Sequence, residues 1–202
     1  MISIMLDQLF ADIPGTVVAE FPVGAAVFRQ GDEAKAIFQV RVGVVSMVRH
    51  LADGGMVTVA TAGANETFAE ASLFSSHYHC DAIARLPCTI LAIPSEGVRA
   101  RLNADPAQAV AFAEFLANQV RDLRARLEIV RVKRASDRVI AWLRWRARGA
   151  PPIVEAGDAW SRVASELGLT PEAFYRTLAA LEKAHLIERK GRQVVLVATV
   201  DE

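Results

Sequence analysis

Residues 160–181 contain side chains that could read the edges of DNA bases. Thr170, Pro171 and Glu172 form a helix-start signal, with a Thr N-cap, a Pro suited to the first helical position and a carboxylate in the first turn. Glu172 and Arg176 are four residues apart, so both point to the outer side of that helix. An Arg can bind the O6 and N7 atoms of guanine, and a Glu can accept from the N4 amine of cytosine. The alternative is an ordinary surface ion pair.

A helical hairpin is expected to position these side chains. Apolar Val163, Ala164 and Leu167 mark one face of a short first helix, and Gly168 can adopt the positive φ that a sharp inter-helix turn needs. The second helix is expected to bury Phe174, Leu178 and Leu181. Its outer face and the flanking positions give the candidate DNA contacts Arg162, Thr170, Glu172, Ala173, Tyr175, Arg176 and Lys183. We favour DNA reading because the small Ala164, the glycine turn and the capped helix agree.

A β-hairpin is predicted after the second helix. Apolar residues 186–187 and 194–197 flank a polar tip over 188–192 that contains Gly191. Lys190 and Arg192 at this tip are expected to contact phosphates, which positions a protein on DNA without reading its sequence.

Residues 161–197 resemble the winged helix-turn-helix of the Crp/Fnr family of transcription regulators. In that family a Glu and an Arg read bases at the positions that Glu172 and Arg176 occupy here. The resemblance implies a homodimer that binds double-stranded DNA at a palindromic site, regulates transcription and contacts RNA polymerase.

The composition is that of a globular protein. The 202 residues are 52% hydrophobic and 23% charged, and they include neither an 18-residue apolar run nor a positively charged leader. Membrane insertion and export are therefore not expected, and the protein is expected to be cytoplasmic. Two cysteines, Cys80 and Cys88, are too few for a disulfide framework and suit a reducing compartment.

Basic side chains are concentrated in one segment, although the net charge is zero. Residues 121–148 hold 10 Lys and Arg but only 3 Asp and Glu. This segment could lie along DNA phosphates, or it could form a solvated face beside a coiled coil. The sequence leaves both interpretations open.

Residues 15–95 have the pattern of many short strands. Apolar segments near 17–21, 27–29, 36–40, 44–48, 57–60, 82–84 and 89–93 alternate with glycine-containing turns, which predicts an antiparallel β-roll. The spacing of Gly24, Gly31 and Gly43 also resembles the cyclic-nucleotide-binding domain of the same family. The expected fold is α+β, with a sensor β-roll over 1–105, a dimerisation helix over 106–134 and a winged helix-turn-helix over 135–202.

Residues 66–84 correspond, by this resemblance, to the phosphate cassette of the family's cyclic-nucleotide readers. In those readers, helix amides and an Arg hold the cyclic phosphate while a Glu binds the ribose hydroxyl. Here Glu70 is kept, but Ala69 replaces a Gly, and Cys80 and Asp81 occupy the Arg and Ser positions. The Asp81 carboxylate would repel the cyclic phosphate, and residues 106–134 contain no Ser or Thr hydroxyl that could hydrogen-bond to an adenine. Cyclic AMP binding is therefore not expected. The effector-pocket candidates are Phe68, Glu70, Cys80, Asp81, Leu123 and Leu127.

His77, His79 and Cys80 suggest a metal or haem site, because imidazole and thiolate bind copper, zinc and haem iron. On an extended strand, however, Cys80 faces away from both histidines. We therefore favour a permanently structural cassette with Cys80 as a small buried hydrophobe, and we assign no cofactor.

A cupin-like metalloenzyme is disfavoured because the positions of its next ligand hold Ile83 and Ala84. A third alternative is a regulatory module that acts on a protein partner, which leaves the capped helix unexplained.

A long helix is predicted from Asp105-Pro106 onward. Its apolar residues step by 4, 3, 4 and 3, which is a heptad pattern, at Leu116, Val120, Leu123, Leu127 and Val130. We call this row of apolar residues the seam, and burying it needs a partner. The resemblance implies that the partner is the same helix of a second subunit. The alternative, for the first two turns only, is packing on the chain's own β-roll. Ser136 and Asp137 are expected to cap a helix over 138–148, with a hinge at 133–137.

Overall fold

The computed structural model describes residues 10, 12–51, 54–155, 160–191 and 193–197 of the chain. These residues form two compact units, Met1–Leu116 and Ala117–Glu202. One helix, α3 (Pro106–Arg131), contains residues of both units. The division therefore falls about eleven residues after the boundary at 105 that the sequence analysis expected, so the predicted dimerisation helix belongs in part to the first unit.

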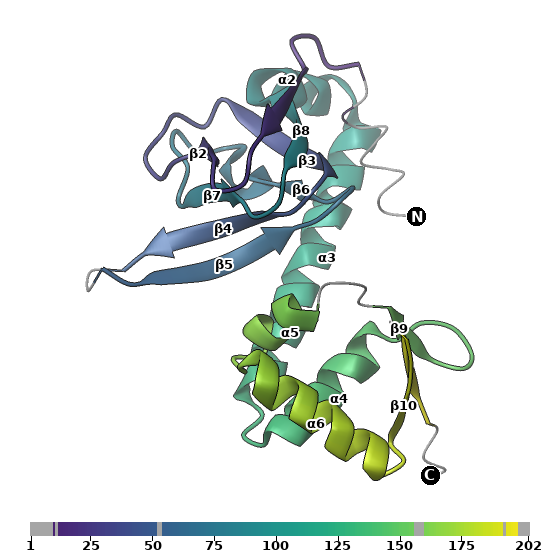
Figure 1. Ribbon diagram of the computed structural model, residues 1–202. Helices are drawn as coiled ribbons and strands as arrows, with labels where there is room; N and C mark the ends of the chain where they lie inside the picture. Colours follow the sequence, from purple (N-terminus) through teal and green to yellow (C-terminus); the bar gives the residue numbers. More distant parts are fainter. Residues whose placement is uncertain (1–9, 11, 52–53, 156–159, 192, 198–202) are drawn as a thin grey trace. The chain divides into compact units, whose positions relative to one another are not determined.

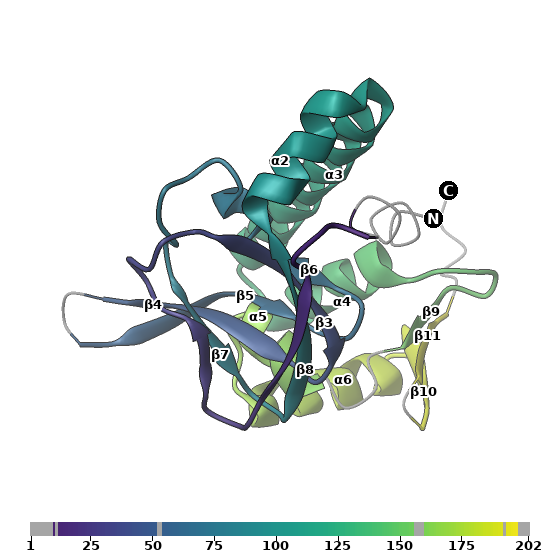
Figure 2. The same cartoon turned by 90° about the horizontal axis from the view of Figure 1, so that it is seen from above.

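The first unit is built on two antiparallel sheets (Figures 1 and 2). One sheet has the strand order β1-β8-β3-β6 and the other the order β2-β7-β4-β5. The strands are β1 (Val17–Phe21), β2 (Ala26–Phe28), β3 (Ala36–Val42), β4 (Val45–His50), β5 (Met56–Ala62), β6 (Thr67–Phe68), β7 (Asp81–Ala84) and β8 (Cys88–Pro94). The expected strands are present, and the predicted α+β class is confirmed.

Aromatic side chains fill the space inside the roll. The rings of Phe28 and Tyr78 stack with their centroids 3.8 Å apart, and those of Phe38 and Phe68 stack at 5.1 Å. The Tyr78 hydroxyl is satisfied within this apolar region because it donates to the Ala36 carbonyl at 2.7 Å and accepts from the Ala36 amide at 3.1 Å. Burial of this phenol raises its pKa.

A helix that the sequence analysis did not predict, α2 (Ser95–Ala104), closes one end of the roll. Val98 of α2 and Phe112 and Phe115 of α3 are buried in a cluster with strand residues such as Ile37 and Ile93. The Asp105 side chain begins α3, since its Oδ1 atom accepts from the amides of residues 107 and 108 at 2.9 and 3.4 Å. The first turns of α3 are thus part of the core of the first unit, which is why the division falls at Leu116.

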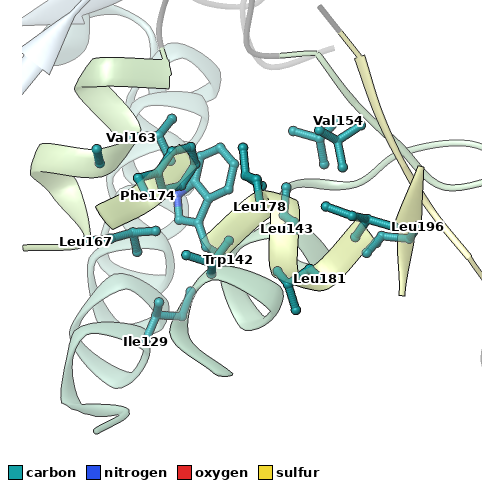
Figure 3. Close-up of a cluster of buried hydrophobic side chains, with 14 residues drawn as sticks. Ile129, Trp142, Leu143, Val154, Val163, Leu167, Phe174, Leu178, Leu181 and Leu196 are labelled. Carbon is teal, nitrogen blue, oxygen red and sulfur yellow. The ribbon is translucent and has the colours of Figure 1, made fainter. Parts of the chain in front are cut away.

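The second unit contains the end of α3, the helices and strands that follow it, and a small sheet of order β10-β11-β9. Its elements are α4 (Ala135–Arg146), β9 (Ile153–Glu155), α5 (Trp160–Glu166), α6 (Pro171–Lys183), β10 (Ile187–Lys190) and β11 (Gln193–Leu196). Strand β9 was not predicted. Figure 3 shows the core that these elements share, in which Trp142, Leu143, Phe174 and Leu178 lie together.

The expected cap of α4 is wrong. The helix begins at Ala135, its N-cap is Arg134, and no side chain caps it. Ser136 and Asp137 lie inside the first turn instead, where the Ser136 hydroxyl donates to Asp137 Oδ1 at 3.1 Å. Because α3 ends at Arg131, the break between the two helices covers residues 132–134, slightly before the predicted hinge.

Candidate nucleic-acid interface

Helices α5 and α6 form a helix-turn-helix. Gly168 lies between them with φ of +64°, and the Leu169 amide donates to the Ala164 carbonyl at 2.9 Å, which closes the turn. Ala164 is completely buried, and its small side chain allows the two helices to approach each other. The predicted turn therefore has the predicted conformation.

The start of α6 is capped as predicted. The Thr170 hydroxyl oxygen accepts from the Ala173 amide at 3.2 Å, and Pro171 occupies the first helical position. Phe174, Leu178 and Leu181 form the buried face of the helix. A helix fixed along one face in this way presents its opposite face at a defined angle.

The outward face of α6 carries the candidate base contacts. Glu172, Tyr175, Arg176 and Lys183 are exposed, while Ala173 is half-buried. No ion pair joins Glu172 to Arg176, although both residues lie within the described part of the chain. The surface ion pair considered from the sequence is therefore not formed, and both charged groups remain open to a partner.

Glu172 is held in its charged form. Its own backbone amide, and then the Thr170 hydroxyl, lower the pKa of the carboxyl by hydrogen bonding. An ionised carboxylate only accepts hydrogen bonds, and so it suits the amine edge of a base rather than a carbonyl edge.

The wing packs next to the end of α6 through a contact that the sequence analysis did not find. Arg189 of β10 donates from Nε to Glu182 Oε2 at 2.7 Å, and its backbone amide donates to Oε1 at 3.1 Å. These bonds lower the pKa of the Glu182 carboxyl. Nothing in the spacing of a helical Glu and a strand Arg seven residues later signals this pair, because it depends on the direction in which the chain reverses at His185, whose φ is +58°.

The candidate cationic DNA contacts outside α6 are less open than those on α6. Lys190 pairs with Glu188 on its own strand at 3.0 Å. Arg162 is half-buried, and its Nε atom lies 3.8 Å from Glu166 Oε1. Arg192 lies outside the described residues. Of the candidate cations that the structure describes, those without an ion pair are consequently on α6 rather than on the wing.

The Asp81 carboxylate of the cassette already has hydrogen-bond partners within the first unit. Asp81 is 5% exposed, and its carboxylate accepts from the Gln30 amide at 2.7 Å. His50 Nε2 lies 3.1 Å from the same carboxylate, and Arg29 Nη1 lies 3.5 Å from it. The Gln30 amide bond, followed by the His50 bond and charge and the Arg29 charge, lowers the pKa of Asp81 against the opposing effect of burial.

The other cassette residues are dispersed. Ala69 has φ of +65°, a conformation that suits the Gly it replaces, and Glu70 begins the short helix η1 (Glu70–Ser72). Phe68 is part of the aromatic core, and Cys80 is half-buried beside it. The last two pocket candidates, Leu123 and Leu127, belong to the second unit and are 58% and 50% exposed.

The three metal candidates do not converge. His77 Nδ1 lies 2.8 Å from the Ser76 hydroxyl, and His79 Nε2 lies 3.2 Å from the Ser75 hydroxyl. Burial raises the pKa of the Cys80 thiol, which disfavours the thiolate that a metal needs. Across the described ranges, no three His, Cys, Asp or Glu side chains are placed to hold a metal ion.

The heptad residues divide into two groups. Leu116 packs against the core of the first unit, so it is not a free member of the seam. Val120, Leu123, Leu127 and Val130 are exposed by 38% to 58%. The described residues of a single chain therefore leave these four apolar side chains open to solvent.

Comparison with known proteins finds similar sequences and structures. Residues 18–105 match the family described as the cyclic nucleotide-binding domain. A cyclic AMP receptor protein from Thermus thermophilus is 28% identical over 169 residues, which cover 83% of this chain and 77% of that protein. The chain is thus similar, over most of its length, to a receptor protein of the cyclic AMP receptor type. The relatives found in this way are transcriptional regulators and not enzymes, which argues against the cupin alternative.

Solved structures show the same fold. FixK2 from Bradyrhizobium japonicum superposes with a TM-score of 0.69 at 19% identity, over 91% of this chain and 93% of that one. A transcriptional regulator of the CRP family from Thermus thermophilus gives a TM-score of 0.58 at 21% identity, over 89% and 92%. Within the described residues, no helix has the length and apolar character to cross a bilayer.

Proposed function

We propose that this chain is a transcription regulator of the Crp/Fnr type that binds DNA sequence-specifically as a homodimer, with α6 of each subunit in a major groove. The observation that carries the proposal is the unpaired Glu172 and Arg176 on the open face of a helix whose other face is buried. A capped, fixed helix with one acceptor and one guanidinium matches the requirements of direct base readout. Such a protein would act in the cytoplasm, where it would meet DNA and RNA polymerase.

Dimerisation would occur along the end of α3. Val120, Leu123, Leu127 and Val130 keep the heptad spacing, and their exposure in one chain supports a second copy of the helix as their cover. In this division of roles, 1–105 form the sensor roll, 106–134 the dimerisation helix and 135–202 the reader. A two-fold dimer would place two α6 helices about 34 Å apart on a palindrome.

The β-roll would not bind a cyclic nucleotide. Asp81 stands where the family's readers use a hydroxyl, and this buried carboxylate already accepts hydrogen bonds from Gln30 and His50. A cyclic phosphate brought to this place would meet a negative charge. Calorimetric titration of the purified protein with cyclic AMP is expected to give no binding at micromolar concentrations, and micromolar or tighter binding would overturn this part of the proposal.

Selection of bound duplexes from a randomised DNA pool tests the proposal as a whole. The purified protein, without added effector and at near-physiological salt, is expected to enrich a palindrome. Failure to bind any duplex, with or without effectors, would contradict it and favour a module that acts on a protein partner.

A further inference from the structure

Four basic side chains surround the break between α3 and α4, and we call them the α3–α4 basic cluster. Arg131 ends α3, Lys133 lies in the break, Arg134 is the N-cap of α4 and Arg138 lies in its first turn. The first three are exposed, and Arg138 is half-buried. Asp137 is the one acidic residue between 131 and 138, so the segment carries a net charge of about +3 at neutral pH.

The cluster has no carboxylate partner among the residues that the structure describes. The ion pairs in this part of the chain involve other cations, and none includes a member of the cluster. The Nε atom of Arg138 is buried without a hydrogen-bond partner. Four like charges within eight residues of the chain repel one another, and an anion that binds among them relieves the repulsion.

The cluster lies beside the turn of the helix-turn-helix. The Nη1 atom of Arg138 is 3.9 Å from the position that a Cβ would occupy on Gly168. Gly168 is three residues before Pro171, the first residue of α6. In a helix-turn-helix, the N-terminal part of the second helix is the part that approaches the bases. Arg138, four residues after Arg134 on α4, is therefore at the end of the reader that approaches DNA.

We propose that the α3–α4 basic cluster is a binding site for DNA backbone phosphates next to the half-site that α6 reads. The inference rests on the proposed function and extends it to residues outside the helix-turn-helix. The guanidinium groups can hold phosphate oxygens in bidentate contacts, and Lys133 can act as a point charge. These contacts fix the position of the reader and add affinity to every sequence equally. The proposal also assigns a role to residues 131–138 of the basic segment 121–148, whose role the sequence left open.

The test compares two double variants with equal loss of charge. Lys133→Gln with Arg134→Gln removes two exposed members of the cluster, and Arg144→Gln with Arg148→Gln removes two exposed arginines at the other end of α4. Fluorescence anisotropy measures Kd at several salt concentrations for the wild type and both variants. Each protein is titrated with a duplex that carries the selected palindrome and with a duplex of scrambled sequence.

The cluster variant is expected to show a shallower salt dependence. Removal of four phosphate-binding side chains per dimer reduces the slope of log Kd against log salt by about 3.6, so a rise from about 50 to about 200 mM salt weakens binding roughly 100-fold less than in the wild type. The loss of affinity at low salt should be the same factor on both duplexes, and the control variant should match the wild type. A cluster variant with the wild-type slope, or a loss confined to the palindrome, would overturn this inference alone. A wild type that binds neither duplex would overturn the proposed function as well.

Discussion

At the scale of single residues, the charged groups on α6 are exposed, whereas a charged group of the β-roll is buried and hydrogen-bonded. Arg176 and Glu172 are exposed and unpaired, although a spacing of four residues on a helix allows an ion pair. Asp81 is buried and accepts hydrogen bonds from a backbone amide and from His50. An open charge suits a residue that meets a partner, whereas a satisfied buried charge suits a residue that holds the fold.

The role of Asp81 predicts a stability change that depends on pH. Its pKa is lower in the folded protein than in the unfolded chain, so its contribution is complete above the unfolded value of about 3.9 and is lost as pH falls through the folded value. Asp81→Asn should reduce the free energy of unfolding by about 1–3 kcal/mol at pH 7, because the Gln30 and His50 donors lose a charged acceptor.

Urea denaturation of the wild type and of Asp81→Asn at pH 7 and at pH 3 measures this difference. The difference in the free energy of unfolding between wild type and Asp81→Asn should be smaller at pH 3 than at pH 7. The control Asp122→Asn changes an exposed carboxylate and should have the same free energy of unfolding as the wild type at both pH values. A gap of the same size at both pH values would show that Asp81 is not the source of the stabilisation.

At the scale of elements, the end of α3 is the surface with the clearest requirement for a partner. Leu123→Glu combined with Leu127→Glu places carboxylates in the exposed seam, and a coiled coil excludes charge from these positions. Sedimentation equilibrium should show a dimer for the wild type and a monomer for the double variant at micromolar concentrations.

Val110→Glu provides the control for this measurement, because Val110 is an equally exposed apolar residue of α3 that lies outside the heptad. It should remain dimeric. A monomeric wild type, or a seam variant that remains dimeric, would contradict the proposal that a second copy of α3 buries this helix face.

The elements that the sequence predicted well are those with local signals. Thr170, Pro171 and Gly168 determine the start of α6 and the turn before it, and the structure has both where expected. The misses concern elements stabilised by distant contacts. Helix α2 follows Pro94 without a side-chain cap, and its Val98 is buried against strands from much earlier in the chain. Strand β9 exists because Val194 pairs with Val154, forty residues away.

The candidate site was predictable to the same extent. The outward residues of α6 follow from helical periodicity alone. The pair Arg189–Glu182 depends on how the chain reverses between α6 and the wing, and this is a tertiary property. The position of Arg138 beside Gly168 likewise requires α4 to pack next to the helix-turn-helix.

At the scale of the whole molecule, the net charge is zero but the charges are unevenly distributed along the chain. Basic side chains are concentrated in residues 121–148, directly before the reader, while the first 120 residues hold 7 Lys and Arg against 12 Asp and Glu. Helix α3 contains residues of both units, so it is the covalent route between the roll and the reader. Any effector of the roll would have to bind two arrangements of the chain with different affinity in order to change DNA binding.

The most direct test of DNA reading by α6 is a double-mutant cycle between Arg176 and single base pairs of the enriched half-site. Kd is measured for the wild type and for Arg176→Ala on the palindrome and on duplexes with one base pair changed. For the wild type, replacement of one G·C pair should cost about 1–3 kcal/mol per half-site, and for Arg176→Ala the same replacement should cost almost nothing. If both proteins discriminate equally at every base pair, Arg176 does not read DNA and the central claim of base reading by its guanidinium is contradicted.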